Sequence, residues 1–330
     1  MSAVSRKKVI SKSKASAGSR KPGSKRSKPG FVWIILAAVV LLLFFEAKSL
    51  FLKGMEAPNF IQVQSIGQFT GTGQDCGHFG AWDVAGLGKD KIVVTDADGG
   101  RILFFDRSGK FLKAVGKKGD GPGEMKEPSG VAADDTHVYF IDAWKSTLTG
   151  LDPNGKQDLT LPLTQGFYGP RGVAWDGKYF YIADTGTHRV VKLSTAGETI
   201  AVFGAKGMGD GKEQFNNPRS LKVNSKGTLF VADSENDRVQ VLDPQGKFLR
   251  TIKVENKVSD VAVDANDRVF VSSPEGNFVK VFTAEGKYVG TLKDGKGQDN
   301  NLHGASGMGI TSDGVLLLTS GDVVSMYRIP

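Results

Sequence analysis

The feature that most constrains the fold is a unit of 40 to 49 residues that recurs along the chain. Four copies align directly, and two more divergent copies complete the set. In each copy one apolar run ends on an Asp or a Ser, at Asp96, Asp142, Asp184, Asp233, Ser273 and Ser320. Self-similarity with a period of this length is the signature of a repeat architecture.

The pattern within each unit predicts four short strands. Apolar or alternating runs such as "RGVAWD" are separated by Gly, Asn and Asp, which are strand and turn signals. No segment after Leu52 has a helical period. Four short antiparallel strands in each of six units predict an all-β fold, a six-bladed β-propeller over residues 59–330.

Three stretches carry a resemblance to a known family: "YIADTGTHRVVKL" from Tyr181, "FVADSENDRVQVLDPQGKFL" from Phe230, and the connector "GAKGMGDGKEQFNNP" from Gly204. They resemble the NHL repeat, and the resemblance extends over residues 59–330. It implies six blades. Thr147, Phe278 and Val323 depart from the pattern, because they stand where the repeat carries Arg.

The stretch "NFIQVQSIGQFTGTG" from Asn59 completes the ring. The sixth copy stops at Pro330 after its third strand, and residues 59–66 align with the fourth strand of the other copies. We therefore predict that residues 59–66 pair with the last blade and close the propeller, which removes an unpaired edge.

The N-terminal part has a different composition. Residues 1–30 carry ten basic residues and no acidic one, with almost nothing to bury, so we predict a disordered cytoplasmic arm. The apolar run from Phe31, continued to Leu52, is long enough to cross a bilayer as a helix. Residues 53–58 are then a short linker.

Two interpretations of the apolar segment stay open. An uncleaved signal anchor over 31–52 keeps the basic N-terminus inside and places the propeller in the periplasm or outside the cell, on a single-pass membrane protein. A cleaved signal peptide is the alternative, with "AKS" at Ala47 to Ser49 as its cleavage site. The length of the basic lead favours the anchor.

The high net charge belongs to the arm. The whole chain has 43 basic and 35 acidic residues, so the part after residue 30 is close to neutral and does not indicate nucleic-acid binding. Cys76 is the only cysteine, which excludes an intrachain disulfide.

Asp and Arg stand five residues apart in three copies, beginning at Asp96, Asp184 and Asp233. Opposite charges at this spacing can fix the turn between the second and third strands by charge-assisted hydrogen bonds. Because the pair recurs, we predict a structural role rather than a catalytic one.

Enzymes on this fold work at the mouth of the central channel, where the first strands converge. The alignment places one residue from each copy there: Trp82, Ser129, Arg171, Arg219, Ser259 and Ser306. Two guanidinium groups with an aromatic face favour an anionic, carboxylate-bearing ligand. The alternative is that each Arg pairs with a neighbouring acidic residue.

Metal ligands are few. Cys76, His78 and His303 could form a small site, since the connectors that carry them precede neighbouring blades, but ordinary surface positions are the alternative. Propellers similar to amidating lyases or gluconolactonases carry His or acidic ligands around the channel, and no matching motif is present here. No cofactor is predicted.

Two functions follow from these patterns. The first is a membrane-tethered extracytoplasmic module that binds a protein, peptide or glycan partner, since loops at the faces of a rigid propeller suit recognition. The second is a metal-dependent enzyme of the lyase or lactonase type with its site in the channel.

Overall fold

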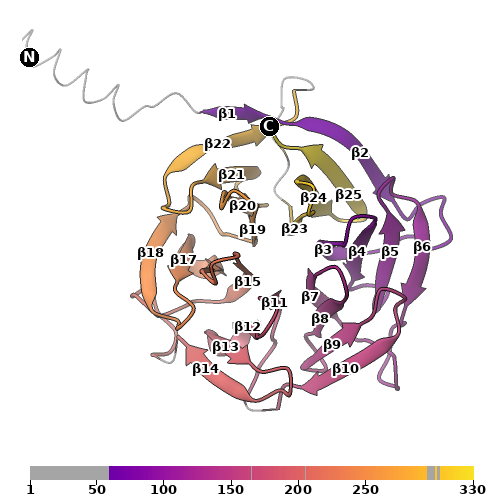
Figure 1. Cartoon of the computed structure of the whole chain (residues 1–330), viewed down its shortest axis with the longest axis horizontal. Helices are drawn as coiled ribbons and strands as arrows, with labels where there is room; N and C mark the ends of the chain where they lie inside the picture. The colour runs from indigo at the N-terminus through magenta and orange to yellow at the C-terminus, as the bar shows by residue number, and fades with distance from the viewer. Residues whose placement is uncertain (1–58, 165, 205, 296–301, 303–304) are drawn as a thin grey trace, which may run out of the picture. The chain divides into compact units, whose positions relative to one another are not determined.

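The fold is a closed ring of six β-sheets (Figure 1). The computed structural model describes residues 59–164, 166–204, 206–295, 302 and 305–330. The predicted all-β six-bladed propeller is therefore confirmed. The predicted arm (1–30), membrane segment (31–52) and linker (53–58) lie outside the described residues. Across the part of the chain that is described, no helix has the length and apolar character needed to span a membrane.

The first three blades follow one another along the chain. Blade 1 contains β3 (Ala81–Leu87), β4 (Lys91–Asp96), β5 (Arg101–Asp106) and β6 (Phe111–Val115). Blade 2 contains β7 (Pro128–Ala133), β8 (Val138–Asp142), β9 (Thr147–Leu151) and β10 (Gln157–Pro162). Blade 3 contains β11 (Gly172–Trp175), β12 (Phe180–Asp184), the 3-10 turn η1 (Thr185–Thr187), β13 (Arg189–Leu193) and β14 (Thr199–Phe203).

The other three blades include the closure. Blade 4 contains β15 (Pro218–Val223), β16 (Leu229–Asp233), the 3-10 turn η2 (Ser234–Asn236), β17 (Arg238–Leu242) and β18 (Phe248–Lys253). Blade 5 contains β19 (Asp260–Val263), β20 (Val269–Ser273), β21 (Phe278–Phe282), β22 (Tyr288–Lys293) and the added β1 (Phe60–Gln62). Blade 6 contains β23 (Gly307–Ile310), β24 (Val315–Ser320), β25 (Val323–Arg328) and β2 (Gln64–Thr70).

The burial pattern explains the strand sequences. The second strand of each blade is nearly continuously apolar because both of its faces are covered, as in β12, where every residue is buried. The outermost strands alternate instead, as in β6, because one face meets solvent. The hydrophobic clusters lie between adjacent blades; the one between blades 2 and 3, for example, joins Ile141 and Leu148 to Phe180 and Val191.

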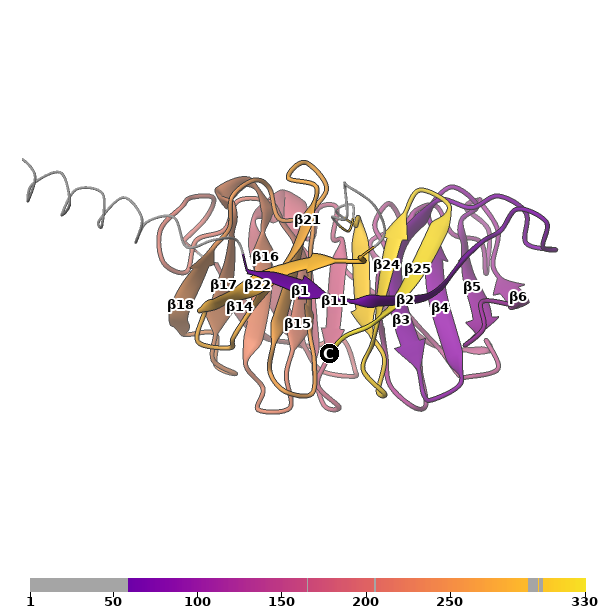
Figure 2. The same cartoon turned by 90° about the horizontal axis from the view of Figure 1, so that it is seen from above.

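The closure has a different register from the predicted one. β2 pairs antiparallel with β25, from Gln64 opposite Arg328 to Thr70 opposite Val323, so the fourth strand of blade 6 is Gln64–Thr70 and not residues 59–66. The preceding β1 runs parallel to β22 of blade 5. Figure 2 shows both strands at the rim.

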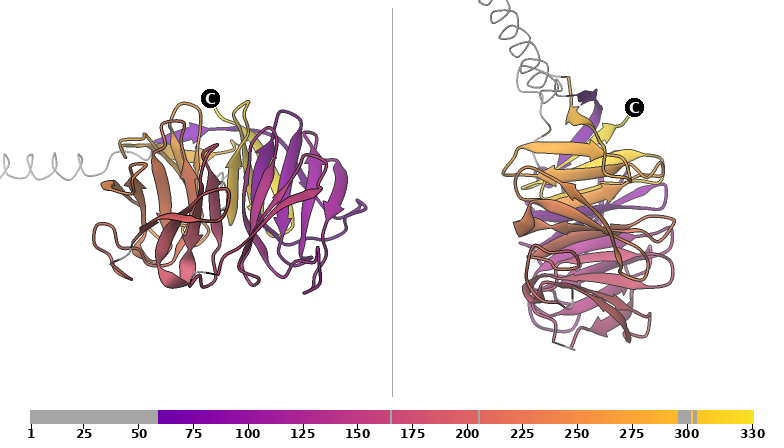
Figure 3. Two further views of the ribbon diagram at one scale, coloured as in Figure 1. Left: turned by 60° about the horizontal axis from the view of Figure 1, so that its bottom comes forward. Right: turned by 90° about the vertical axis from the view of Figure 1, so that its left-hand side faces the viewer.

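The physical reason lies at Val63 and Phe69. Val63 is buried between the two strands and donates its N–H to the carbonyl of Lys293 in blade 5, while Phe69 is buried in the cluster between blades 6 and 1. The N-terminal segment therefore fastens two blades, as the oblique view of the ring also indicates (Figure 3).

Candidate functional site

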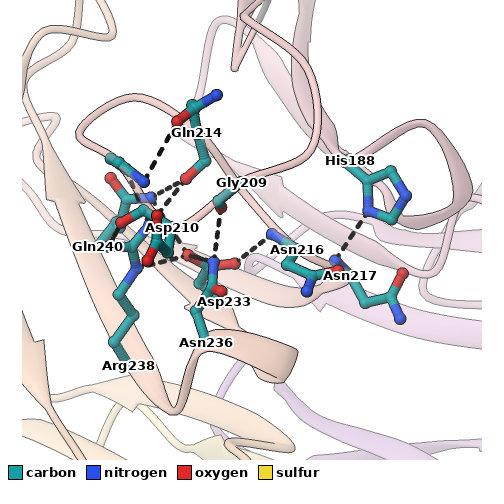
Figure 4. A network of polar contacts seen from close by, with 11 residues as sticks. His188, Gly209, Asp210, Gln214, Asn216, Asn217, Asp233, Asn236, Arg238 and Gln240 are labelled. Atoms are coloured by element: carbon teal, nitrogen blue, oxygen red, sulfur yellow. Dashed lines mark hydrogen bonds and ion pairs between the residues drawn. The ribbon is translucent and has the colours of Figure 1, made fainter.

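The Asp–Arg pairs hold the loops of one face. Arg101, Arg189 and Arg238 each donate from Nε to the Asp five residues earlier, over 2.6, 2.8 and 2.6 Å. Each guanidinium also donates to carbonyls of the connector that precedes its blade, as Arg238 does at Gly211 and Gln214 (Figure 4). The predicted charge-assisted hydrogen bonds across these turns are confirmed.

The mouth of the channel on this face is lined by five of the six predicted residues. They are Trp82, Arg171, Arg219, Ser259 and Ser306. The sixth, Ser129, is fully buried beside the mouth. The first strands therefore converge at the positions that the repeat alignment placed there.

Two of the predicted serines join neighbouring blades. Ser129 Oγ donates to the carbonyl of Arg171 over 3.0 Å, and Ser259 Oγ donates to the carbonyl of Ser306 over 3.1 Å. In both cases the acceptor is the equivalent residue of the next blade. A hydroxyl used in this way stabilises the ring.

Both channel arginines lie over the indole of Trp82. The guanidinium carbons of Arg171 and Arg219 are 4.8 and 5.5 Å from the ring centroid, within the range of a cation–π interaction. The free volume left among these side chains is about 10 Å³, close to what one water molecule needs. The mouth is therefore filled by its own side chains.

The two arginines differ in their partners. Arg171 Nη1 lies 3.1 Å from Glu127 Oε1, so this guanidinium is neutralised. Arg219 has no hydrogen bond or ion pair with any side chain or carbonyl of the described residues. Burial, followed by the charge of Arg171, lowers the pKa of Arg219. Pairing with an acidic neighbour thus holds for Arg171 and not for Arg219.

Two buried carboxylates lie behind the mouth. Asp83 accepts hydrogen bonds from the N–H groups of Val84 and of Val131 in blade 2, at 2.8 and 2.9 Å. Asp260 accepts the N–H of Met308 in blade 6 at 2.5 Å and the hydroxyl of Ser220. Burial, followed by the charge of Asp83, raises the pKa of Asp260 to about 7.

The proposed metal ligands do not form a site in the described residues. Cys76 is buried in the hydrophobic cluster with Phe69 and Phe79. His78 is exposed and its Nδ1 lies 3.1 Å from Asp322 Oδ2. His303 is outside the described residues. Within the described part of the chain no three His, Cys, Asp or Glu side chains gather closely enough to hold a metal ion.

A groove between blades 2 and 3 was not predicted. It has a volume of about 370 Å³, and its lining includes Trp144, Phe167, Tyr168 and Arg171. Trp144 and Tyr168 are each 73% exposed. A signal was present in the sequence, because Trp144 occupies a turn where the other copies have small or polar residues, and "GFY" interrupts a connector.

The groove is held in shape by the backbone. Tyr168 N–H donates to Asp184 Oδ1 over 2.8 Å, and its carbonyl accepts the N–H of Gly186. The Phe167 ring lies 5.4 Å from the guanidinium carbon of Arg189. The exposed aromatic rings are thus carried on fixed backbone, which reduces the ordering cost of binding.

The opposite mouth of the channel is wider, and most of its lining residues have small or aliphatic side chains. It has a volume of about 210 Å³. Every blade contributes to its lining, which includes Val84, Ala132, Ala174, Lys222, Ala262 and Gly309. The charged groups of the channel are therefore concentrated toward the face that carries the groove.

Comparison with known proteins identifies relatives of this architecture. Residues 162–273 match the family described as the SMP-30/Gluconolactonase/LRE-like region, and residues 83–165 match a family described as a 6-bladed beta-propeller. The shared feature is the six-bladed fold.

Solved structures with the same fold include two lyases and a chain of a protein complex. A streptogramin B lyase structure is 13% identical, with a TM-score of 0.58 over 80% of this chain and 97% of that one. A catalytically inactive virginiamycin B lyase from Staphylococcus aureus, solved with quinupristin, is 11% identical, with a TM-score of 0.56 over 80% and 99%. A chain of a nidogen/laminin complex is 16% identical, with a TM-score of 0.54 over 64% and 79%. At these identities the likeness concerns the fold.

Proposed function

We propose that this protein is a membrane-tethered binding module that recognises a carboxylate-bearing partner on the face carrying the groove. The observation that carries the proposal is the position of Arg171, which lines both the groove and the channel mouth. The exposed rings of Trp144 and Tyr168 offer flat apolar faces, and Arg171 lines the same groove. Such a combination orients a ligand with one apolar face and one anionic group.

Charge complementarity supports an anionic ligand. Arg219 is partly buried next to Arg171, and although the charges of Asp260 and Glu235 act on it from a distance, no described carboxylate forms an ion pair with it. A ligand carboxylate beside Arg171 in the groove would reduce the repulsion between the two guanidinium groups. Acidic glycans and peptides with an exposed carboxylate both meet this requirement.

The tether is proposed from the sequence. An apolar helix over 31–52, with the basic arm inside, would place the propeller in the periplasm or outside the cell. Since β1 begins at Phe60, only a few residues would separate the ring from the bilayer. Trypsin added to spheroplasts, whose outer membrane is opened, should then cleave the propeller of a destabilised variant while an epitope placed before residue 30 stays protected.

The binding test uses full-length protein in mild detergent and a panel of oligosaccharides and short peptides with and without free carboxylates. We expect only carboxylate-bearing members to bind. We also expect Trp144→Ala and Arg219→Gln each to weaken binding by about tenfold or more, on the scale of a lost stacking or charge-assisted contact. Arg107→Gln removes a half-buried arginine that is paired with Asp313 away from the groove and is the matched control. Equal binding by all four proteins would reject the site.

An enzymatic role is the second candidate, favoured by the family match over residues 162–273 and by Asp260. With a pKa of about 7, this carboxyl could exchange a proton at neutral pH. Its oxygens already accept three protein hydrogen bonds and the mouth is nearly filled, so a substrate has little access to Asp260. We therefore prefer the binding function at the groove to the enzymatic one. Turnover of lactone or cyclic peptide substrates that is lost in Asp260→Asn, with the fold intact, would reverse this preference.

A further inference from the structure

Blade 2 keeps one half of the Asp–Arg pair and lacks the other. Blades 1, 3 and 4 have both residues. Blade 5 has Ser273 and Phe278, and blade 6 has Ser320 and Val323, so these blades replaced the two charges together. Blade 2 retains Asp142, but Thr147 stands at the Arg position.

The Asp142 carboxylate is buried without a cation. Its residue is 1% exposed, and its oxygens accept the N–H groups of Lys126, Glu127 and Lys145 over 2.7, 3.1 and 3.1 Å. No ion pair reaches it from the described residues. In blade 4, by contrast, Asp233 Oδ2 alone accepts from Arg238 Nε, Asn236 Nδ2 and Gln240 Nε2 (Figure 4).

A cavity occupies the place of the missing side chain. In blade 4, Arg238 and Gln240 fill the space between the turn and the connector. The corresponding residues of blade 2 are Thr147 and Thr149, and the cavity beside them has a volume of about 260 Å³. Its lining includes Gly121, Glu124, Asp142, Lys145, Thr147 and Thr149.

The connector of blade 2 has the same form as the connector of blade 4. A bridge joins Lys118 to Met125, as another joins Met208 to Phe215. The Glu124 carboxylate also accepts the N–H of Gly121, as Gln214 does for Gly211 in blade 4. The carbonyl acceptors that receive a guanidinium in blade 4 are therefore present in blade 2.

Lys145 uses these acceptors in the free protein. Its Nζ donates to the carbonyls of Gly121 and Glu124 over 3.3 and 2.6 Å, whereas Arg238 Nη2 donates to the equivalent carbonyls. An ammonium is a point-like donor and leaves Asp142 unpaired. A planar guanidinium can serve a carboxylate and carbonyls together, as it does in the sister blades.

We propose that this cavity binds the arginine side chain of a partner protein, which takes the place of the Arg that blade 2 lacks. The guanidinium donates to Asp142 and competes with Lys145 for the connector carbonyls. This site does not depend on the ligand of the groove. The turn from Ala143 to Ser146 separates the two, since Trp144 lines the groove and Lys145 lines the cavity.

The test measures binding of N-acetyl-L-arginine methylamide to the full-length protein in mild detergent. The lysine analogue and the neutral citrulline analogue serve as ligand controls. We expect saturable binding of the arginine probe with a Kd on the order of 1 mM, as suits a single side chain, and at least about tenfold weaker binding of citrulline.

Variants of the cavity should shift the affinity for the arginine probe in opposite directions. Lys145→Ala removes the competitor and should tighten binding by about threefold or more. Thr147→Arg fills the cavity from within, as three sister blades do, and should abolish binding while raising Tm. Asp142→Asn should also abolish binding, and Ser312→Arg on the opposite face is the control for added charge. Absence of saturable binding to both the natural protein and Lys145→Ala, or unchanged binding in a folded Thr147→Arg, would overturn the proposal.

Discussion

The ring of Phe69 lies 4.5 Å from the ring of Phe105, measured between centroids, although Phe69 precedes every complete blade and ends in blade 6 while Phe105 belongs to blade 1. This contact places the N-terminal strand in the same hydrophobic cluster as the first and last blades. The ring is closed by side-chain packing as well as by the strand ladder.

Truncation of Phe69 should therefore open the ring. Phe69→Ala is expected to lower the free energy of unfolding by about 3–5 kcal/mol, the usual cost of removing a buried aromatic side chain. Ile66→Ala is the control on the same strand, because Ile66 is 40% exposed. Its expected effect is below about 1 kcal/mol. Urea unfolding of both variants measures the difference, and similar losses would contradict the packing argument.

The Asp233–Arg238 pair offers a test of paired replacement. Arg238→Phe leaves the buried Asp233 carboxylate without its guanidinium, and the expected loss is about 3–5 kcal/mol. Adding Asp233→Ser reproduces the Ser–Phe arrangement of blade 5 and should recover part of that loss. Thermal unfolding of the two variants measures this recovery. A double variant less stable than the single one would show that the unpaired Asp233 carboxylate does not cause the loss of stability.

Asp260 predicts a specific pH dependence of stability. Its folded-state pKa of about 7 lies above the ordinary value of 3.8, so the unfolded chain releases this proton first as pH rises. Its contribution is complete below pH 3.8 and is lost as pH rises toward about 7. The slope of Tm against pH from about 5 to 7 should be less negative in Asp260→Asn. Identical slopes would assign the pH dependence to other groups.

Cys76 should be unreactive in the folded protein. The thiol is buried in the cluster between blades 6 and 1, and burial raises the pKa of Cys76, which reduces the thiolate fraction at neutral pH. Labelling with a thiol-specific disulfide reagent should be slow in native buffer and fast in denaturant. Rapid native labelling would show that the closing segment detaches readily.

The repeat pattern was sufficient for the architecture because its information is local. Strand length, turn residues and the small set of residues before the third strand recur in each unit, and His188 and Asp237 indeed adopt the left-handed backbone that this position requires. The alignment also located the channel mouth, since equivalent positions of a ring meet at the axis.

The register of the closing strand and the partners of individual side chains depend on contacts between blades, so the pattern within one repeat unit could not predict them. The sequence predicted the closing strand at residues 59–66. In the structure, Val63 and Phe69 are buried, the closing strand is Gln64–Thr70, and Phe60–Gln62 pairs with blade 5 instead. Ser129 and Ser259 look like ligand-binding residues in an alignment, and only the next blade shows that their hydroxyls are used.

The sequence by itself thus determined six units, their four strands and the convergence of their first strands, because each follows from apolar periodicity and turn chemistry within one unit. Only the tertiary structure decided which charges are neutralised. Arg171 forms an ion pair with Glu127, while Arg219 forms none with the described residues. Asp142 is buried beside a cavity because Thr147 is too short to fill it. Charge pairing across blades depends on distances that no spacing along the chain fixes.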